Sequence, residues 1–189
     1  MSEAPAQPSP ADVVAFWRAA GPKRWFEKDA AFDDGIRRRF LKLHEAAAAG
    51  KLTNWEGNAE GALALLILLD QFPRNMFRST ARAFVTDMKA RELSRHAIAS
   101  GFDRELSPIM RMFLYLPLEH SENLNDQLES VRLTGALAAE NPGHTEILEH
   151  AEQHLEVIRR FGRFPGRNHA LGWQSTEEEM DFLKDQKRK

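Results

Sequence analysis

The sequence predicts an all-α protein, and two observations carry that prediction. Apolar residues recur at helical spacing along most of the 189 residues, whereas no long segment alternates with the period of two expected of a strand. Short segments rich in Gly, Pro, Ser and Asn separate the helical ones. We therefore expect about eight helices, arranged as stacked antiparallel hairpins because short connections favour antiparallel neighbours.

Start and stop signals give the approximate bounds of each helix. Ser9 is expected to cap the first helix, with Pro10 in its first turn and Gly21 at its end. Pro73 is expected to end the third, because the residue before a proline disfavours helical conformation. Thr176 and Glu179 predict a capping box for the last helix. The predicted helices cover residues 10–20, 31–49, 58–70, 80–101, 108–116, 121–140, 145–160 and the segment from 176 onward.

Two helices have apolar stripes that predict which face is buried. The stripe of the second helix consists of Ile36, Phe40, Leu43 and Ala47. The stripe of the sixth helix consists of Leu124, Leu128, Val131, Gly135 and Ala138.

Composition indicates one globular domain over residues 10–189, preceded by a disordered tail over residues 1–9. The net charge of -2 gives no basic field for nucleic acid, and the run "ALALLILL" is too short to span a membrane. The chain contains no cysteine, and its start does not resemble a signal peptide. We expect a cytoplasmic protein with no nucleic-acid or membrane partner and no cofactor.

Helix counting predicts where the unusual loops meet. Two helices separate residues 21–29 from 71–78, two more lead to 117–120, and another two lead to 161–168. Since antiparallel hairpins return the chain to the same end, these four loops are expected to converge at one end of the protein. The prediction makes "DQFPRN" a neighbour of "FGRFPGRN".

The converging loops carry the candidate functional residues. Three arginines would lie there beside carboxylates and asparagines, and arginine binds carboxylate or phosphate bidentately. The candidate ligand-binding residues are Asp70, Arg74, Asn75, Glu119, Arg163, Arg167 and Asn168. His120 and Glu122 are the candidate pair for proton transfer. The aromatic side chains expected to wall the site are Trp25, Phe72, Phe161 and Phe164.

Three interpretations of this cluster stay open. It is a structural network in which arginines hold helix ends together, a binding site for a small anionic ligand or peptide, or the active site of a small hydrolase acting on an anionic metabolite. His150 and His154 stand at i, i+4 spacing, but no zinc or di-iron motif accompanies them, so no metal site is expected. His154 falls beside the apolar arc of its helix and is expected to bond into the core network.

Several motifs also carry a resemblance to a known family. They are "FW" at 16–17, "WFEKDAAFD", "LILLDQFPRNMFR", "FLYLPLEHSE", "DQ" at 126–127, "RFGRFPGRNHALG" and "STEEEMDFL". Together they resemble the bacterial family catalogued as domain of unknown function 924. The resemblance covers nearly the whole chain after the tail. It implies an all-helical fold similar to tetratricopeptide-repeat proteins, but it implies no particular reaction.

The chain departs from the family pattern at two positions. Relatives usually have "FPHRN", where this chain has Gly166, and usually an arginine after "LG", where this chain has Trp173. The resemblance therefore transfers no catalytic role to Gly166 or Trp173.

Overall fold

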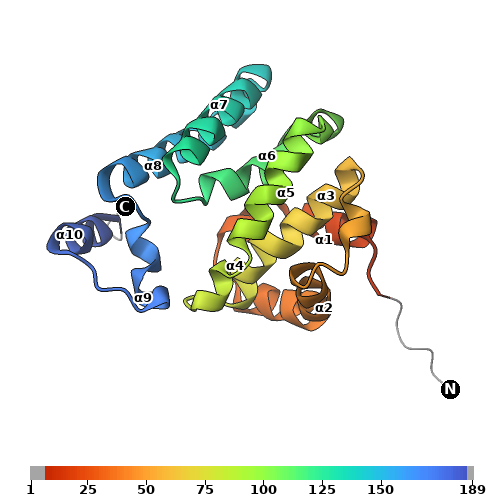
Figure 1. Cartoon of the computed structure of the whole chain (residues 1–189), viewed down its shortest axis with the longest axis horizontal. Coiled ribbons are helices and arrows are strands. Elements are labelled where there is room, and N and C mark those ends of the chain that lie inside the picture. The colour runs from red at the N-terminus through yellow and green to blue at the C-terminus, as the bar shows by residue number, and fades with distance from the viewer. Residues whose placement is uncertain (1–6, 187–189) are drawn as a thin grey trace. The chain divides into compact units, whose positions relative to one another are not determined.

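The structure is a computed structural model that describes residues 7–186, and within that range all regular secondary structure is helical (Figure 1). The all-α prediction is thus confirmed. Most of the predicted disordered tail, residues 1–6, lies outside the described residues. Ser9 caps the first helix as predicted, since its hydroxyl accepts from the Asp12 amide and the Asp12 carboxylate accepts from the Ser9 amide.

The chain divides into two compact units, which are described separately. The N-terminal unit comprises the described residues up to Arg78 together with Ala83–Pro117, and the C-terminal unit comprises Ser79–Arg82 and the residues from Leu118 onward. The prediction of a single domain over 10–189 stays a prediction.

The N-terminal unit is built on six α-helices. They are α1 (Pro10–Phe26), α2 (Ala30–Ala48), α3 (Ala59–Leu66), α4 (Phe72–Met76), α5 (Asp87–Ala99) and α6 (Pro108–Glu119), of which α6 continues into the C-terminal unit. Helix α3 packs against α1 and α5, and α2 packs against α4. Large aromatic side chains fill the core between them, and each contributes about 2–3 kcal/mol through burial. The fully buried ones are Trp17, Phe40, Phe72 and Phe113.

Two residues that were predicted to wall a site, Phe72 and Trp25, lie in the core of the N-terminal unit instead. Phe72 is fully buried and lies 4.9 Å from Phe40, measured between ring centroids. Trp25 is also buried, and its indole N–H donates to the carbonyl oxygen of Trp17 at 2.6 Å. Trp25 reaches this position because the helix resumes after a break at Gly21, which has φ 72°. Gly21 therefore interrupts α1 instead of ending it as predicted.

The segment around Pro73 differs most from the sequence prediction. No helix end occurs there: a π-helical turn, Ile67–Gln71, joins α3 directly to α4. A proline within an α-helix clashes with the carbonyl four residues earlier, which here belongs to Leu69. The wider π turn opens the hydrogen-bond ladder at this carbonyl, and the Thr86 hydroxyl donates to it at 2.5 Å.

The neighbouring carbonyls of the π turn are satisfied in the same way. His44 Nδ1 donates to the Leu68 carbonyl at 2.8 Å, and an Arg74 Nη donates to the Asp70 carbonyl at 2.8 Å. Side chains from three elements therefore replace the lost backbone bonds, which is why the helix passes through Pro73. Pro117 likewise lies inside α6, although the sequence placed a helix end there.

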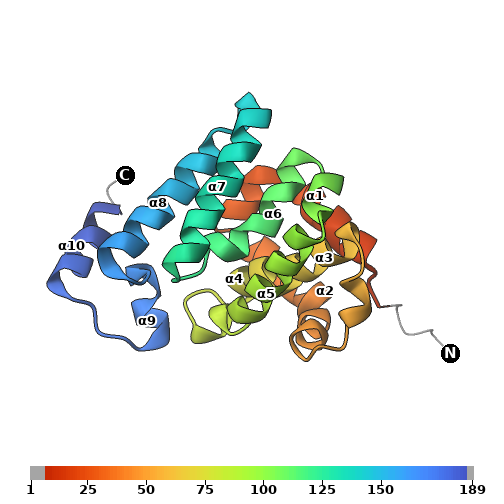
Figure 2. The same ribbon diagram turned by 45° about the horizontal axis from the view of Figure 1, so that its top comes forward.

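The C-terminal unit contains α7 (Leu124–Glu140), α8 (Glu146–Phe161), α9 (Asn168–Leu171) and α10 (Glu177–Gln186). Helices α7 and α8 lie side by side as a hairpin (Figures 1 and 2). The predicted capping box is present at α10: the Thr176 amide donates to the Glu179 carboxylate at 2.8 Å, and the Glu179 amide donates to the Thr176 hydroxyl at 3.2 Å. Helix α9 was not predicted.

The predicted buried face of α7 is only partly right, because Ala138 is buried but the first two leucines of the stripe are not. Leu124 and Leu128 are 46% and 44% exposed, respectively. The buried face instead carries polar residues beside two leucines and an alanine, and it comprises Asp126, Gln127, Ser130, Leu133, Thr134, Leu137 and Ala138. Polar groups can occupy this face where hydrogen bonds compensate their desolvation. Gln127, for example, donates to the carbonyls of Glu119 and Ser121, both at 2.6 Å.

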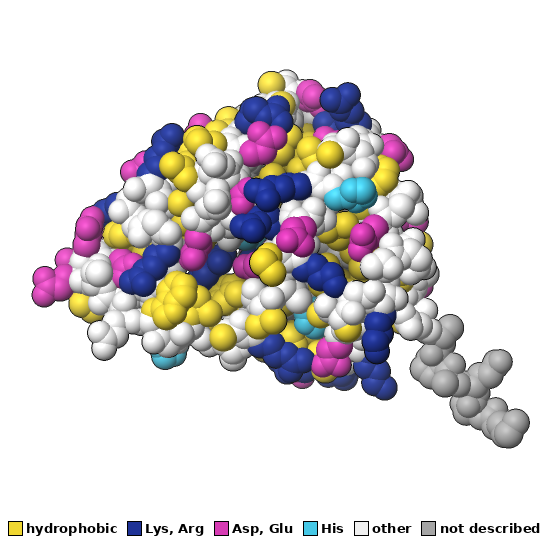
Figure 3. All heavy atoms as spheres, in the orientation of Figure 1, with side chains coloured by type: hydrophobic (Ala, Val, Ile, Leu, Met, Phe, Trp, Pro, Cys, Tyr) yellow, Lys and Arg dark blue, Asp and Glu magenta, His cyan; other side chains and the backbone are white. Residues whose placement is uncertain are grey.

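The surface agrees with the nearly balanced charge of the sequence. Lys and Arg side chains are interspersed with Asp and Glu on the face shown in Figure 3. Among the described helices, none is long and apolar enough to cross a membrane.

Candidate functional site

The N-terminal unit contains the first part of the predicted cluster, around Asp70. This carboxylate is 1% exposed, and the Arg74 guanidinium lies 3.0 Å from it. Arg74 also binds both carboxylate oxygens of Asp87, at 2.9 and 3.0 Å. Burial opposes the charge on Arg74, but attraction by the two carboxylates outweighs it and raises its pKa. Arg74 therefore holds the π turn against the start of α5.

Asn75 belongs to a second polar contact of the same unit. Its amide donates to the Asp33 carboxylate at 2.8 Å, and Arg78 binds both oxygens of that carboxylate. Arg78 also reaches the carbonyl oxygen of Glu27 at 3.5 Å. Two of the four loops predicted to converge, 21–29 and 71–78, therefore do meet.

In the C-terminal unit, Arg163 forms a two-pronged ion pair with Glu179. Its Nε and Nη2 donate to the two carboxylate oxygens at 2.7 and 2.9 Å. Asn168 adds a bond of 3.2 Å to the same carboxylate, which is 2% exposed. These bonds, of which the one from Arg163 contributes most, lower the pKa of Glu179 to about 2. Arg163 and Asn168 thus fix α10 to the loop before α9.

The two positions that depart from the family pattern lie in or near this clamp. The guanidinium carbon of Arg163 lies 5.5 Å from the ring centroid of Trp173, so the tryptophan covers the ion pair by a cation–π contact. A Cβ atom on Gly166 would meet no atom within 4 Å. The space next to the Gly166 backbone is therefore open to a Cβ atom.

Arg167 and Glu122 join the loop 117–120 to the loop 161–168. The Nη2 of Arg167 donates to the carbonyl oxygen of His120 at 2.6 Å, and its guanidinium carbon lies 4.7 Å from the ring centroid of Phe164. The Glu122 carboxylate accepts from the Phe164 amide at 2.9 Å. These two loops meet, as two did in the N-terminal unit. The convergence of all four stays a prediction.

His154 lies beside these two loops. Its Nδ1 donates to the carbonyl oxygen of His150 at 2.8 Å and lies 3.2 Å from the Glu119 carboxylate, so it bonds into the core network as predicted. The ring also contacts Phe164 and His120, at centroid distances of 5.4 and 6.4 Å. Burial is the largest cause that lowers the pKa of His154 to about 4, and the nearby cationic groups add to it.

The state of His154 has a chemical consequence. At neutral pH the imidazole is uncharged, and the proton on Nδ1 is fixed by the two acceptors. Nε2 therefore carries a lone pair, and no described residue donates to it. The side chain is 36% exposed, so solvent or a ligand reaches the ring. The i, i+4 pair with His150 drew attention to His154 in the sequence, but its contact with Glu119 required the tertiary fold.

Phe161 and two buried polar atoms of α7 also belong to the C-terminal unit. Phe161 packs on Phe182 at a centroid distance of 5.1 Å, so it supports α10. On the buried face of α7, Gln127 Oε1 and Ser130 Oγ have no hydrogen-bond partner among the described residues. An unpaired buried polar atom costs about 1–3 kcal/mol unless a water or ligand atom bonds it. Within residues 7–186, no group of three or more His, Cys, Asp or Glu side chains is arranged to hold a metal ion.

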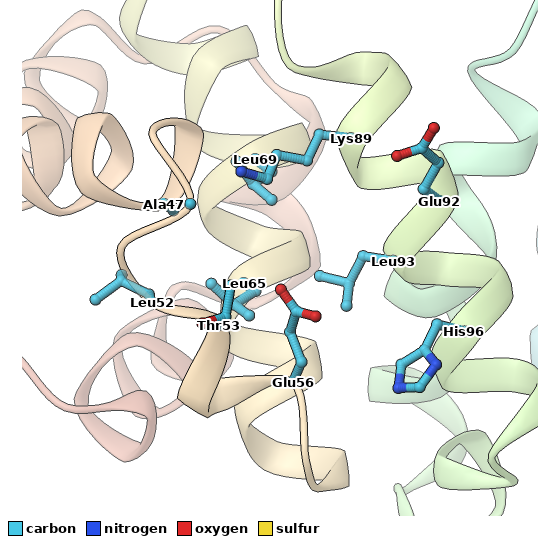
Figure 4. A pocket seen from close by; sticks show the side chains of 11 residues that line it. Ala47, Leu52, Thr53, Glu56, Leu65, Leu69, Lys89, Glu92, Leu93 and His96 are labelled. Atoms are coloured by element: carbon cyan, nitrogen blue, oxygen red, sulfur yellow. The ribbon is translucent and has the colours of Figure 1, made fainter.

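A separate groove of about 270 Å³ lies in the N-terminal unit (Figure 4). It is bordered by the C-terminal end of α2, the turn Thr53–Trp55 with Glu56, α3 and α5. Figure 4 shows Glu56 and Leu93 approaching each other from opposite walls, with Lys89 and Glu92 toward one end and His96 toward the other. None of these residues was predicted from the sequence.

The fold and these clusters define an all-α protein with buried Arg–carboxylate clamps. Its family is shown by sequence: the model described as bacterial protein of unknown function (DUF924) matches residues 13–187, and the chain belongs to that family. The solved structure of the protein of unknown function ATU0120 from Agrobacterium tumefaciens is 44% identical, with a TM-score of 0.87. The match covers 93% of this chain and 97% of that one. The search of curated proteins gave no match.

Proposed function

We propose that the protein is a binding module for a small anionic ligand, and that the site lies in the C-terminal unit around His154. The fixed ring of His154 is the observation that carries the proposal. Its Nε2 is an acceptor held in one orientation by Glu119 and the His150 carbonyl. Such preorganisation strengthens binding, because the acceptor loses little freedom when the ligand arrives.

The residues around His154 indicate the class of ligand. Arg167 brings a positive charge that contributes to the low pKa of His154, and that charge favours an anion. Nε2 requires a hydrogen-bond donor, which a hydroxyl group supplies. Phe164 contacts the His154 ring and adds apolar surface. These features together favour a hydroxylated carboxylate or a comparable anionic group on a peptide.

The other predicted ligand-binding residues have different roles in this proposal. Asp70, Arg74 and Asn75 stabilise the N-terminal unit, and Arg163 and Asn168 hold Glu179. Glu119 orients His154 and does not contact the ligand. Arg167 remains the candidate that attracts the anion.

The test compares two dicarboxylates that differ by one hydroxyl group. We expect L-malate to shift the NMR signals of the His154 ring and to bind more tightly than succinate. His154→Gln should reduce the affinity for malate to that for succinate, whereas His150→Gln should not, since only the His150 carbonyl takes part. Equal affinity of the two acids for the unmodified protein would contradict the proposal.

One observation favours hydrolysis of an anionic metabolite as a second candidate function. A carboxylate that orients an imidazole whose other nitrogen is unprotonated is an arrangement suited to general-base catalysis. In this alternative His154 takes the proton-transfer role that the sequence assigned to His120 and Glu122. Turnover should then fall as the pH decreases through about 4, where His154 becomes protonated, and a pH–rate profile without that limb would exclude His154 as the base.

A further inference from the structure

The groove of the N-terminal unit carries unpaired negative charge. Neither Glu56 nor Glu92 forms an ion pair or a hydrogen bond through its side chain within the described part of the chain, although both border the cavity. Lys89 is the one cationic side chain in its lining, and its Nζ donates to the Ala48 carbonyl at 3.1 Å. Lys89 thereby neutralises the C-terminal end of α2, where negative partial charge accumulates.

The floor of the groove is apolar. Leu65 and Leu69 come from the continuous helix that includes α3 and the π turn, and Leu52 and Leu93 come from the two walls. All four are at most 7% exposed, so they form part of the core as well as the lining. A ligand here would therefore bury an alkyl chain against leucine and bring a polar end to the carboxylates.

The wall that carries Glu56 is held firmly in place. A Cβ atom on Gly61 would lie 2.1 Å from the carbonyl oxygen of Trp55. Only glycine at position 61 therefore allows the turn to approach α3 this closely. Trp55 itself is buried. The backbone that carries the next residue, Glu56, is thus packed directly against α3.

We propose that this groove binds a small primary amine whose apolar chain lies on the leucines and whose ammonium group lies at the Glu56 carboxylate, with Glu92 adding negative charge at the end of the groove. A volume of about 270 Å³ is small for a ligand pocket, which restricts the ligand to a short chain. An ammonium group suits the two carboxylates, whereas a carboxylate on the ligand would be repelled by them. The groove is independent of the site proposed around His154, since every lining residue belongs to the N-terminal unit.

The experiment uses three probes with the same branched chain: 3-methylbutylamine, the zwitterion leucine, and 4-methylpentanoate. Each is titrated into the full-length protein while the methyl NMR signals of Leu52, Leu65 and Leu93 are followed. We expect saturable shifts with the amine, weaker ones with leucine and none with the acid. The amine response should weaken as salt is added, because salt screens the attraction of the partly exposed carboxylates.

Glu56→Gln should weaken amine binding by about tenfold, the effect of losing one charge-assisted hydrogen bond. Glu60→Gln is the matched control, since it removes the same charge from an exposed position of α3 outside the groove. An unchanged thermal unfolding temperature of both variants shows that the fold is intact. The proposal is overturned if the amine gives no saturable shift, if the acid or leucine binds as tightly as the amine, or if both variants weaken binding equally.

Discussion

At the scale of single residues, exposure separates two arginine–glutamate pairs that look alike in the sequence. Arg160 and Glu178 form a pair at 2.8 Å in which both side chains are largely exposed, at 45% and 62%. Arg163 and Glu179 form a pair at 2.7 Å in which the glutamate is 3% exposed. Water can solvate both charges of the first pair when the pair separates. In the second pair, Arg163 offsets the desolvation of a carboxylate that water does not reach.

Arg163→Ala should therefore destabilise the protein by about 1–3 kcal/mol, because it leaves Glu179 buried without its cation. Arg160→Ala should change the free energy of unfolding by no more than about 0.5 kcal/mol. Chemical denaturation of the two variants measures both values. Equal effects would mean that the Arg163 pair contributes no more than a surface contact.

At the scale of elements, the π turn shows how side chains sustain an irregular helix. The Leu69 carbonyl lies four residues before Pro73 and accepts from Thr86, which is 6% exposed. Thr86→Val keeps the shape of the side chain and removes its hydroxyl. We expect a loss of about 1–2 kcal/mol in the free energy of unfolding, because the buried carbonyl loses its donor. Thr53→Val, at an exposed position, is the control and should have little effect.

The ends of the helices show what could and could not be predicted from the sequence. Local signals succeeded where the cause is local: the cap at Ser9 and the box of Thr176 and Glu179 are both present. The predicted helix end at Pro73 failed because the compensating donors His44 and Thr86 come from distant positions in the chain.

The prediction of the buried face of α7 failed in part for a related reason. Hydrophobic periodicity placed Leu124 and Leu128 inside, but the buried face is decided by hydrogen bonds that Gln127 makes to the end of α6 and the loop that follows it. The prediction of the candidate site was limited by the same dependence on tertiary contacts. The sequence identified Arg163 and Glu119, but it could not show that their partners are Glu179 and His154.

At the scale of the whole molecule, two ionisable groups whose pKa values are lowered by folding make the stability depend on pH. His154 is neutral in the folded protein down to about pH 4, whereas in the unfolded chain it takes up a proton below about 6.5. The unfolded state therefore binds more protons between these values, and stability falls as the pH decreases from 6.5 to 4. Glu179 extends the loss, because its pKa rises from about 2 to 4.5 on unfolding, so its contribution disappears between pH 4.5 and 2.

His154→Gln isolates the first of these two effects. We expect the free energy of unfolding of the original protein to fall by about 1–2 kcal/mol more than that of the variant between pH 6.5 and 4.5, a value reduced for solvent screening of the partly exposed ring. Urea denaturation at half-unit pH steps measures the difference. His150→Gln should stay closer to the original protein than His154→Gln does, because the charge of the His150 side chain is only a minor cause of the low pKa of His154. Parallel curves for His154→Gln and the original protein would mean that folding does not lower the pKa of His154, so that the ring takes up its proton near pH 6.5 in both states. Nε2 would then lose its lone pair below about pH 6.5 instead of about pH 4, and both the binding proposal and the general-base alternative would lose their acceptor over that range.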